Sequence, residues 1–160
     1  MSVEVRPAQA SDAEWLASAY DADWEGPSMT LDGVDIPLLG LPTLVAEDDG
    51  ELCGYLVHDV SDTPDEPTTL LAMAAHPQRQ GTGRALIEAF LERHPGPVRV
   101  VTTNDNLAAV AFYQKCGFRI TGVRSGAVDR SREVKPAIPL VGEGGIPIHD
   151  ELVLERHPEA

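Results

Sequence analysis

The chain has 160 residues, of which 42% are apolar, so it is long enough for one domain with a substantial core. Its 26 acidic and 12 basic residues give a formal charge of −14, and its average surface therefore repels polyanions such as nucleic acid or an anionic membrane. No apolar run approaches the roughly 18 residues of a membrane span and no signal peptide is recognisable, so we expect a soluble, cytoplasmic protein without nucleic-acid or membrane partners.

The first third of the chain predicts a strand, a helix and an irregular connection. Val3 to Arg6 is typical of a short strand, and Ser11 or Asp12 can cap a helix that continues to Tyr20. Residues 25–42 contain three Gly and three Pro among scattered Leu and Ile. This composition predicts a loop or a broken helix over the core.

A hairpin and a strand followed by a helix are predicted in the middle of the chain. The dipeptide Asp49-Gly50 lies between two apolar runs and is a strong hairpin signal. Thr68 to Ala75 is an apolar strand, and a helix from Gly83 to Arg93 follows it. The helix stops at HPGP, because a residue before proline is pushed out of the helical region.

The last third predicts two more strands and a helix. Val98 to Thr103 is a β-branched strand, and the helix after it can be capped by Asn104 or Asn106 and closed by Gly117. The segment GFRITGVRSGAV resumes strand character, residues 131–148 form a Pro- and Gly-rich connection, and HDELVLER is the last strand. The order of elements predicts an α/β fold with a mixed sheet, in which the central strand-helix-strand crossover is parallel and right-handed. We expect a single domain over residues 1–160.

The cysteines do not indicate a disulfide framework or a metal site. Cys53 and Cys116 lie far apart in dissimilar settings, which favours thiols over a disulfide. Neither has a second Cys or a His at zinc-ligand spacing, so we expect no metal.

Residues 76–86, HPQRQGTGRAL, connect the middle strand to its helix. A helix N-terminus has unpaired N–H donors and a positive dipole end, so an anion can bind there without a basic side chain. Gly81 and Gly83 lack a Cβ and let the backbone approach a phosphate closely. The turn predicts phosphate binding, although a Gly-rich connection of this kind is also a common packing turn.

Two familiar phosphate motifs are absent from the sequence. A nucleotide triphosphate loop needs GxxxxGK[ST], and the chain contains no such string. The dinucleotide fingerprint needs GxGxxG, but Leu86 occupies the position of the third Gly. An ATP-binding or dinucleotide-binding protein is therefore disfavoured.

The turn Gln78-Arg79-Gln80-Gly81-Thr82-Gly83 has the form [Q/R]xxGx[G/A]. It resembles the coenzyme A pyrophosphate loop of the GCN5-related N-acetyltransferase (GNAT) superfamily, although His76-Pro77 lies nearer the glycines than usual. A second register, Gln80-x-x-Gly83-x-Ala85, also fits the pattern. We prefer the first, because it puts the following apolar residues on one buried helical stripe: Leu86, Ile87, Phe90 and Leu91.

A second motif extends the resemblance over most of the chain from Leu44 to Phe118. The segment NDNLAAVAFYQKCGF is similar to the superfamily's Nxx[A]xxxYxxxGF helix. Asn106, Ala109 and Tyr113 are spaced i, i+3 and i+7, which puts them on one helical face beside which a coenzyme can lie. The three residues could instead have structural roles, with Asn106 as the helix cap, Ala109 in a close packing contact and Tyr113 half-buried in the core.

The resemblance implies a centrally splayed β-sheet flanked by helices, with acetyl coenzyme A (acetyl-CoA) entering between the strands at Thr68–Ala75 and Val98–Thr103. It implies direct transfer of an acetyl group to a primary amine of a small molecule or a peptide. Backbone groups of Met73, Ala74 and Ala75 would bind the pantetheine arm and, through an N–H, the oxyanion. The other residues implied to contact the coenzyme are Arg79, Gln80, Gly81, Thr82, Gly83, Arg84, Asn106 and Ala109.

The resemblance also implies a general acid, Tyr113. A tyrosine with the ordinary pKa of about 10 is protonated at neutral pH, and a leaving thiolate with a pKa of about 8.5 can take its proton. The base that deprotonates the incoming ammonium stays unassigned between a water chain and side chains near strand ends. The side-chain candidates are Glu47, His58, Asp59, His76, His149, Asp150 and Glu151.

Three questions stay open at this point. A non-catalytic sensor that binds acyl-CoA would keep the glycine turn and lack a working acid, and Tyr113 counts against it. Residues 131–148 could cover the acceptor pocket, with Arg132 and Lys135 contacting an acidic group, or could form an ordered surface loop or a homodimer contact. The acceptor is open among protein amino termini, lysines, amino acids, polyamines and aminoglycosides.

Overall fold

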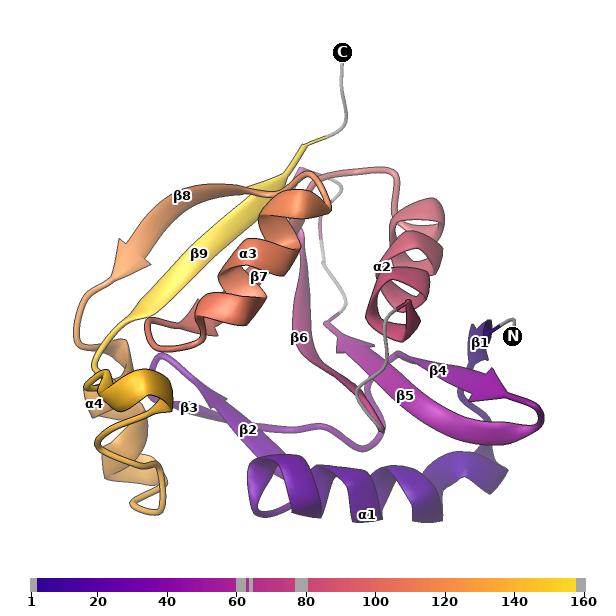
Figure 1. Cartoon of the computed structure of the whole chain (residues 1–160), viewed down its shortest axis with the longest axis horizontal. Helices are drawn as coiled ribbons and strands as arrows, with labels where there is room; N and C mark the ends of the chain where they lie inside the picture. The colour runs from indigo at the N-terminus through magenta and orange to yellow at the C-terminus, as the bar shows by residue number, and fades with distance from the viewer. Residues whose placement is uncertain (1–2, 60–62, 64, 77–80, 158–160) are drawn as a thin grey trace. The chain divides into compact units, whose positions relative to one another are not determined.

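The computed structural model describes residues 3–59, 63, 65–76 and 81–157 (Figure 1). It is a mixed α/β fold with a large, mostly antiparallel sheet flanked by helices. The chain divides into two compact units. Unit 1 comprises Met1–Met29 and Pro37–Val98, and unit 2 comprises Thr30–Ile36 and Arg99–Ala160.

Strands in the order β1-β4-β5-β6 form the sheet of unit 1, and each pairing is antiparallel. The β4–β5 connection is the predicted hairpin. Asp49 and Gly50 have φ angles of 56° and 81°, the left-handed conformations that this two-residue turn requires. The strands are β1 (Val3–Pro7), β4 (Thr43–Asp48), β5 (Glu51–His58) and β6 (Thr68–Ala75), and the last of these has the predicted bounds.

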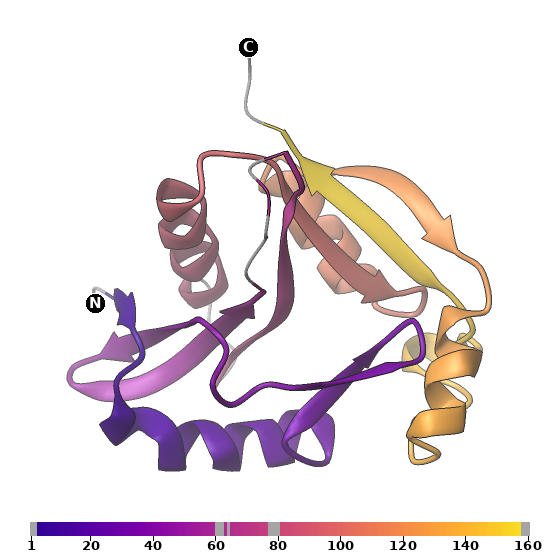
Figure 2. The same cartoon turned by 180° about the vertical axis from the view of Figure 1, so that it is seen from behind.

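Two helices, α1 (Ala13–Trp24) and α2 (Thr82–Arg93), cover opposite faces of this sheet (Figures 1 and 2). Side chains alternate along a strand, so neighbouring residues of β5 face different helices. Tyr55 packs edge-on against Tyr20 of α1, with the ring centroids 5.0 Å apart. Gly54 faces α2, and a Cβ at this position would lie 2.9 Å from Ala74 O and 3.1 Å from Thr82 Cγ2. The missing side chain therefore lets the first turn of α2 approach β5 closely.

The core of unit 1 includes most of the predicted stripe on α2. Leu86, Ile87 and Phe90 are each at most 1% exposed, whereas Leu91 is partly exposed. On the other face, Leu16 and Tyr20 of α1 are buried against the sheet. Apolar side chains thus fix both helices to the same sheet.

Strands in the order β7-β9-β8 form the sheet of unit 2. They are β7 (Val98–Thr103), β8 (Arg119–Arg124) and β9 (Glu151–Arg156), and β8 pairs with β9 in antiparallel register. Helix α3 (Leu107–Lys115) precedes β8, and Gly117, with φ 96°, takes the predicted left-handed position after it. No helix among the described residues is long and apolar enough to cross a bilayer.

The connection between α1 and β4 is a hairpin, where the sequence predicts a loop or a broken helix. Its strands are β2 (Ser28–Leu31) and β3 (Val34–Pro37). Asp32 and Gly33 form the turn with φ angles of 46° and 82°. An Asp-Gly pair is a hairpin signal in its own right, but here the surrounding Gly and Pro obscure it.

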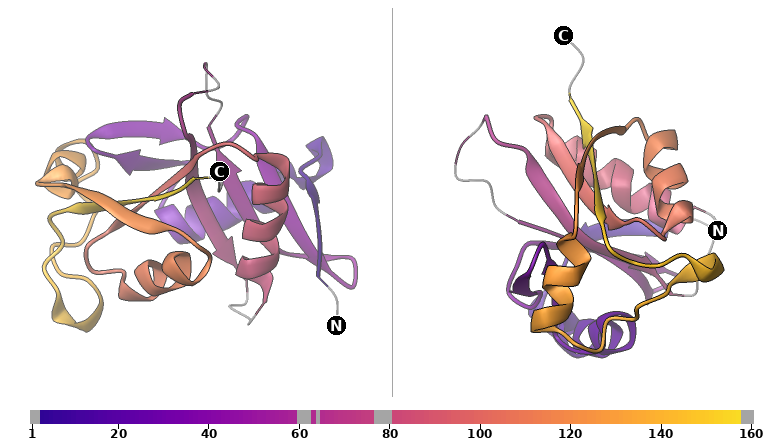
Figure 3. Two further views of the ribbon diagram at one scale, coloured as in Figure 1. Left: turned by 90° about the horizontal axis from the view of Figure 1, so that it is seen from above. Right: turned by 90° about the vertical axis from the view of Figure 1, so that its left-hand side faces the viewer.

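Helix α4 (Ala127–Val134) is a second departure, because the sequence predicts a strand through Val128 and an irregular connection from Ser131. The β2–β3 turn lies beside this helix (Figure 3), and contacts between the two stabilise the helix. Ser131 Oγ accepts a hydrogen bond from Gly33 N (3.0 Å), and Arg130 forms an ion pair with Asp32 (2.6 Å). These partners lie 98 residues away in the sequence, so the local sequence pattern cannot predict the contacts.

Replacing Gly54 with Ala should destabilise the protein by about 1–3 kcal/mol, because the added methyl would overlap Ala74 O and Thr82 Cγ2. Chemical denaturation measures the change. Gly122 in β8 is the matched control, since a Cβ there meets nothing within 4 Å, and Gly122→Ala should change the free energy of unfolding by less than about 0.5 kcal/mol. Equal stability of the two variants would contradict the close approach of α2 to β5.

Candidate active site

The predicted phosphate turn meets the start of α2 in unit 1. Gly81 is the N-cap and has φ 101° and ψ −28°, a left-handed conformation that favours glycine. The first helical hydrogen bond runs from Ala85 N to Gly81 O (2.8 Å), so the amides of Thr82, Gly83 and Arg84 have no acceptor within the helix. Two residues of the predicted site, Arg79 and Gln80, lie outside the described residues.

This helix start fits an anion in both charge and space. The first turn of α2 contains no acidic side chain, and within the described part of the chain no side chain caps the helix. Among the described residues, no atom lies within 4 Å of the position that a Cβ on Gly81 would take. Arg84 is exposed and its ion pair with Glu88 is long (3.6 Å), so its guanidinium can also approach an anion. Amide donors, the helix dipole and open space together suit a diphosphate.

Met73, Ala74 and Ala75 are paired along one edge of β6. Their antiparallel partners in β5 are, in order, Leu56, Tyr55 and Gly54. The pairing continues past the strand, where His76 N donates to Cys53 O (2.7 Å). The predicted splay concerns the other edge of β6, and it stays a prediction together with the coenzyme contacts of these backbone groups.

The second predicted motif folds as helix α3 of unit 2. Asn106 is the N-cap, and its Oδ1 accepts a hydrogen bond from Ala109 N (3.2 Å). Asn106 therefore has the capping role that its side chain favours, which leaves its Nδ2 donors for a ligand. Ala109 is half-buried on the same helix.

Tyr113 is buried in unit 2, with 7% of its surface exposed. Its ring packs against Phe112 and Phe118, at centroid distances of 5.4 and 5.6 Å. Burial raises the pKa of the Tyr113 phenol above its ordinary value, and the neighbouring Cys116 thiol raises it further. The side chain is therefore a protonated phenol throughout the neutral pH range, as a general acid must be.

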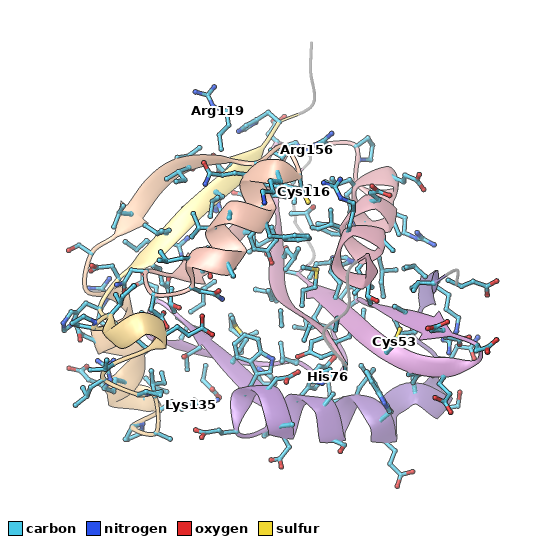
Figure 4. All side chains as sticks on the ribbon, in the orientation of Figure 1. Cys53, His76, Cys116, Arg119, Lys135 and Arg156 are labelled. Carbon is cyan, nitrogen blue, oxygen red and sulfur yellow. The ribbon has the colours of Figure 1, made fainter. Side chains whose placement is uncertain are left out.

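A group of polar side chains that the sequence does not bring together lies at the end of β6, where Figure 4 labels His76. His76 Nε2 lies 2.7 Å from Asp23 Oδ2, and Tyr55 Oη donates to the same oxygen at 2.7 Å. Trp24 Nε1 donates in turn to Tyr55 Oη at 3.0 Å. We call Asp23, Trp24, Tyr55 and His76 the His76 cluster. Its members come from α1, β5 and the end of β6, so no spacing in the sequence could have found it.

A family model described as an Acetyltransferase (GNAT) domain matches residues 40–120. The chain belongs to the GNAT family. GNAT acetyltransferases take the acetyl group from acetyl-CoA, so the chain is an acetyl-CoA-dependent acyltransferase, as the glycine turn and the tyrosine helix predict. The uncharacterized protein YxbD of Bacillus subtilis is 36% identical over 113 residues, which are 68% of this chain and 69% of YxbD.

Solved GNAT structures confirm the predicted GNAT fold. A GNAT family acetyltransferase from Streptococcus pneumoniae is 20% identical, with a TM-score of 0.69 over 99% of this chain and 100% of that chain. A GNAT family acetyltransferase from Elizabethkingia anophelis with acetyl-CoA bound is 20% identical, with a TM-score of 0.68 over 97% of each chain.

Arg132 organises the connection between α4 and β9 of this GNAT domain. Its guanidinium donates to the carbonyl oxygens of Ile138, Pro139 and Ile148 and pairs with Asp129. The side chain is only 15% exposed. These contacts favour an ordered surface loop over an acceptor contact made by Arg132.

A hollow of about 690 Å³ in unit 1 lies apart from the phosphate turn. The end of β1, one side of α1, residues 38–44, His58 and Arg93 line it. Arg93 ends α2, and a helix of 12 residues is about 18 Å long, so this hollow lies at the opposite end of α2 from Gly81. It is not the coenzyme site of this GNAT domain that the sequence predicts.

Gly81→Ala should weaken coenzyme A binding roughly 5- to 30-fold, because a Cβ at φ 101° strains the turn that orients the amides by about 1–2 kcal/mol. Titration calorimetry with coenzyme A measures the affinity. Gly50→Ala is the control, since Gly50 also has a positive φ (81°) and open space around it. This control should lose stability without losing affinity. Unchanged affinity in Gly81→Ala would remove the turn from the coenzyme site.

Proposed function

We propose that this GNAT enzyme acetylates a primary amine, with the start of α2 holding the coenzyme diphosphate. The observation that carries the proposal is the left-handed N-cap at Gly81, which leaves the amides of Thr82, Gly83 and Arg84 open to an anion in a turn without acidic side chains. Acetyl-CoA supplies an activated thioester there.

The residues proposed to hold the coenzyme are those of the two motifs. Gly81, Thr82, Gly83 and Arg84 bind the diphosphate, together with Arg79 and Gln80 of the same motif. The backbone of Met73, Ala74 and Ala75 binds the pantetheine arm and offers an N–H to the carbonyl oxygen. Asn106 donates to the coenzyme from Nδ2, because its Oδ1 already accepts a hydrogen bond from Ala109 N. The small side chain of Ala109 leaves space for the coenzyme beside the helix.

Tyr113 is proposed to donate a proton to the departing sulfur. Its raised pKa keeps the proton on Oη until a stronger base forms nearby. A thiolate that forms in dry surroundings is destabilised by the same desolvation, so its proton affinity rises as well. The two effects of desolvation offset each other, so burial keeps the phenol protonated at neutral pH without preventing the proton transfer.

The acceptor class is a small-molecule or peptide amine. Solved neighbours of similar fold include the ribosomal-protein-S18-alanine N-acetyltransferase of Escherichia coli, Arabidopsis thaliana Naa50 in complex with the bisubstrate analogue CoA-Ac-MVNAL, and nourseothricin acetyltransferase. Their sequences are 15–19% identical to this chain, so they do not choose between the two kinds of amine. A single catalytic domain over residues 1–160, a cytoplasmic location and a homodimer are compatible with this proposal.

Thiol release from acetyl-CoA across a panel of amines tests the proposal directly. We expect free coenzyme A to appear only when an acceptor amine is present. A chain that binds coenzyme A in calorimetry and releases no thiol with any amine would instead be the acyl-CoA sensor.

Tyr113→Phe should slow turnover by about 10²- to 10⁴-fold while coenzyme A binding stays nearly unchanged, because the variant lacks only the proton donor. Tyr20→Phe is the matched control. Tyr20 is also fully buried but belongs to neither motif, so the removal of its hydroxyl should not affect turnover. A Tyr113→Phe enzyme with unchanged kcat would exclude Tyr113 as the acid.

The pH dependence of kcat follows from the state of the same phenol. A raised pKa keeps the acid protonated beyond pH 10, so Tyr113 should cause no fall in kcat between about pH 7 and pH 9. Stopped-flow or steady-state thiol release over this range measures the profile. A fall in kcat centred below pH 9 that disappears in Tyr113→Phe would show that burial does not raise the pKa of this phenol.

A further inference from the structure

The His76 cluster supplies the base that the sequence leaves unassigned. We infer that His76 Nδ1 removes the proton from the acceptor's ammonium group, and that Asp23 positions the imidazole ring for this step. The inference rests on the proposed amine acceptor.

The hydrogen bond to Asp23 fixes which nitrogen of His76 can act. An ionised carboxylate accepts hydrogen bonds and cannot donate one. Nε2 of His76, 2.7 Å from Asp23 Oδ2, therefore carries a proton. In the neutral ring the lone pair then lies on Nδ1, which is the atom that can accept a proton. The side chain is 37% exposed, so a substrate amine can reach the ring.

Asp23 is itself held by the buried side chain of Tyr55. Tyr55 is 0% exposed, donates to Asp23 Oδ2 and accepts from Trp24 Nε1, so the carboxylate cannot rotate freely. The Tyr55 ring lies 6.3 Å from the His76 ring at an interplanar angle of 22°, and Trp15 meets the same ring edge-on at 6.2 Å. Asp23 thus orients the His76 ring, and Tyr55 orients Asp23. Acid–base catalysis needs a base whose position is fixed in this way.

The His76 cluster lies on the face of β6 opposite to the phosphate turn. Gly54 and its partner Ala75 face α2, whose first turn is proposed to hold the diphosphate. Tyr55 and His76 face α1, because alternate residues of a strand point the same way. An amine must reach the thioester from a side that the coenzyme does not occupy. The α1 face of β6 is such a side, and the His76 cluster is on it.

The carboxylates considered for the base have structural partners. Each accepts a hydrogen bond from a guanidinium or from a backbone amide. The pairs are Glu47 with Arg6, Asp59 with Thr69, Asp150 with Gly126 and Glu151 with Asp32. These four hydrogen bonds have structural roles and do not orient an imidazole. The Asp23 carboxylate, in contrast, is bonded to the His76 ring.

The other candidate histidines are less suited. His58 is 8% exposed, its Nδ1 lies 2.7 Å from Asp59 O, and burial lowers its pKa. Its ring packs against Phe90, so it faces α2. His149 pairs with Asp129 at 3.0 Å, but both side chains are about half exposed. His76 differs from both in that a carboxylate orients its ring and the rings of Trp15 and Tyr55 lie beside it, while 37% of the side chain stays exposed.

The proton balance of the reaction is complete with this base. An ammonium N–H bond breaks and the proton passes to His76 Nδ1, which frees the nitrogen lone pair. That pair forms the new C–N bond, and the C–S bond breaks with its electrons on sulfur. The nitrogen loses a second proton, which replaces the one that Tyr113 gives to sulfur. One proton per turnover then leaves the imidazolium for solvent.

The surroundings of His76 fit a protonated alkyl amine. The Asp23 carboxylate attracts a cation, and no basic residue lies in the last turn of α1 to oppose it. The rings of Trp15 and Tyr55 lie beside the imidazole. An aromatic face attracts an ammonium group that comes within about 6 Å of the ring centroid. The substrate class is therefore a cationic primary amine that needs deprotonation before it can attack.

The test measures thiol release with spermidine, lysine and a short peptide as amines. His76→Ala should lower kcat/KM by about 10²- to 10⁴-fold at pH 7, and added imidazole should restore part of the loss. The loss should shrink toward pH 10, because a growing share of an amine with a pKa of about 10.4 is then already neutral. The titratable groups facing His76, Asp23 from α1 and Tyr55 from β5, stay in place in this variant. His76→Gln provides a second variant of similar size.

Asp23→Asn tests the positioning role separately. The amide N–H of Asn would donate to Nε2 and move the ring proton to Nδ1, where it blocks the base. Nitrogen-15 NMR of the His76 ring should show the changed tautomer, and kcat should fall with little change in coenzyme A affinity. A fall in kcat without a change of tautomer would overturn this role for Asp23.

His157→Ala is the control, since His157 is an exposed histidine beside a carboxylate, 3.5 Å from Glu155, and should show unaltered kinetics. Calorimetry with coenzyme A verifies that each variant is folded. An unchanged kcat/KM in His76→Ala, or a loss that neither imidazole nor high pH reduces, overturns the inference and leaves the proposed function intact. If the unaltered protein binds coenzyme A but releases no thiol with any of the three amines, the proposed function fails and the inference fails with it.

Discussion

The antiparallel register between β5 and β6 decides what each face of unit 1 can hold. Gly54 lies opposite Ala75, so the face toward α2 has small residues where the helix begins. Tyr55 lies opposite Ala74, and His76 follows on the same side, so the face toward α1 carries polar aromatic groups. A shift by one residue would exchange the two faces, placing the Tyr55 ring under the first turn of α2 and a glycine opposite Asp23. The helix start and the His76 cluster therefore depend on one pairing.

Close packing at Gly54 and the conformation of Gly81 act on the same helix start. Gly54 permits contact with Thr82 and Leu86, which fixes the axis of α2 against the sheet. Gly81 turns the chain so that the first amides of the helix have no acceptor within it, and no side chain among the described residues caps them. In most helices a Ser, Thr, Asp or Asn would satisfy one of those amides, and in this position such a cap would compete with a bound anion. The two glycines are thus required for different reasons, one for space and one for backbone conformation.

Much of the fold could be predicted because its signals are local. β6 and β7 have the predicted bounds, and the Asp49-Gly50 turn and the Asn106 cap lie where their residue types favour them. Helix α4 could not be predicted, because its stability comes from contacts with Asp32 and Gly33 on a distant turn. The phosphate turn and Tyr113 belong to short motifs and were therefore visible in the sequence. The His76 cluster was not, since 53 residues separate His76 from Asp23 and only the register of β5 and β6 brings Tyr55 between them.

The environments of the proposed acid and base differ in the way that their roles require. Tyr113 is buried among aromatic rings, where an anion is poorly solvated, so the phenol keeps its proton until sulfur needs it. His76 is partly exposed and bonded to a carboxylate, so it can accept a proton as a paired imidazolium and then return it to water. Tyr113 can be buried because it regains its proton from the attacking nitrogen and not from bulk solvent. His76 must be exposed because it passes a proton to solvent in every turnover. Two titratable groups held in contrasting surroundings can thus take opposite roles at one pH without any metal ion.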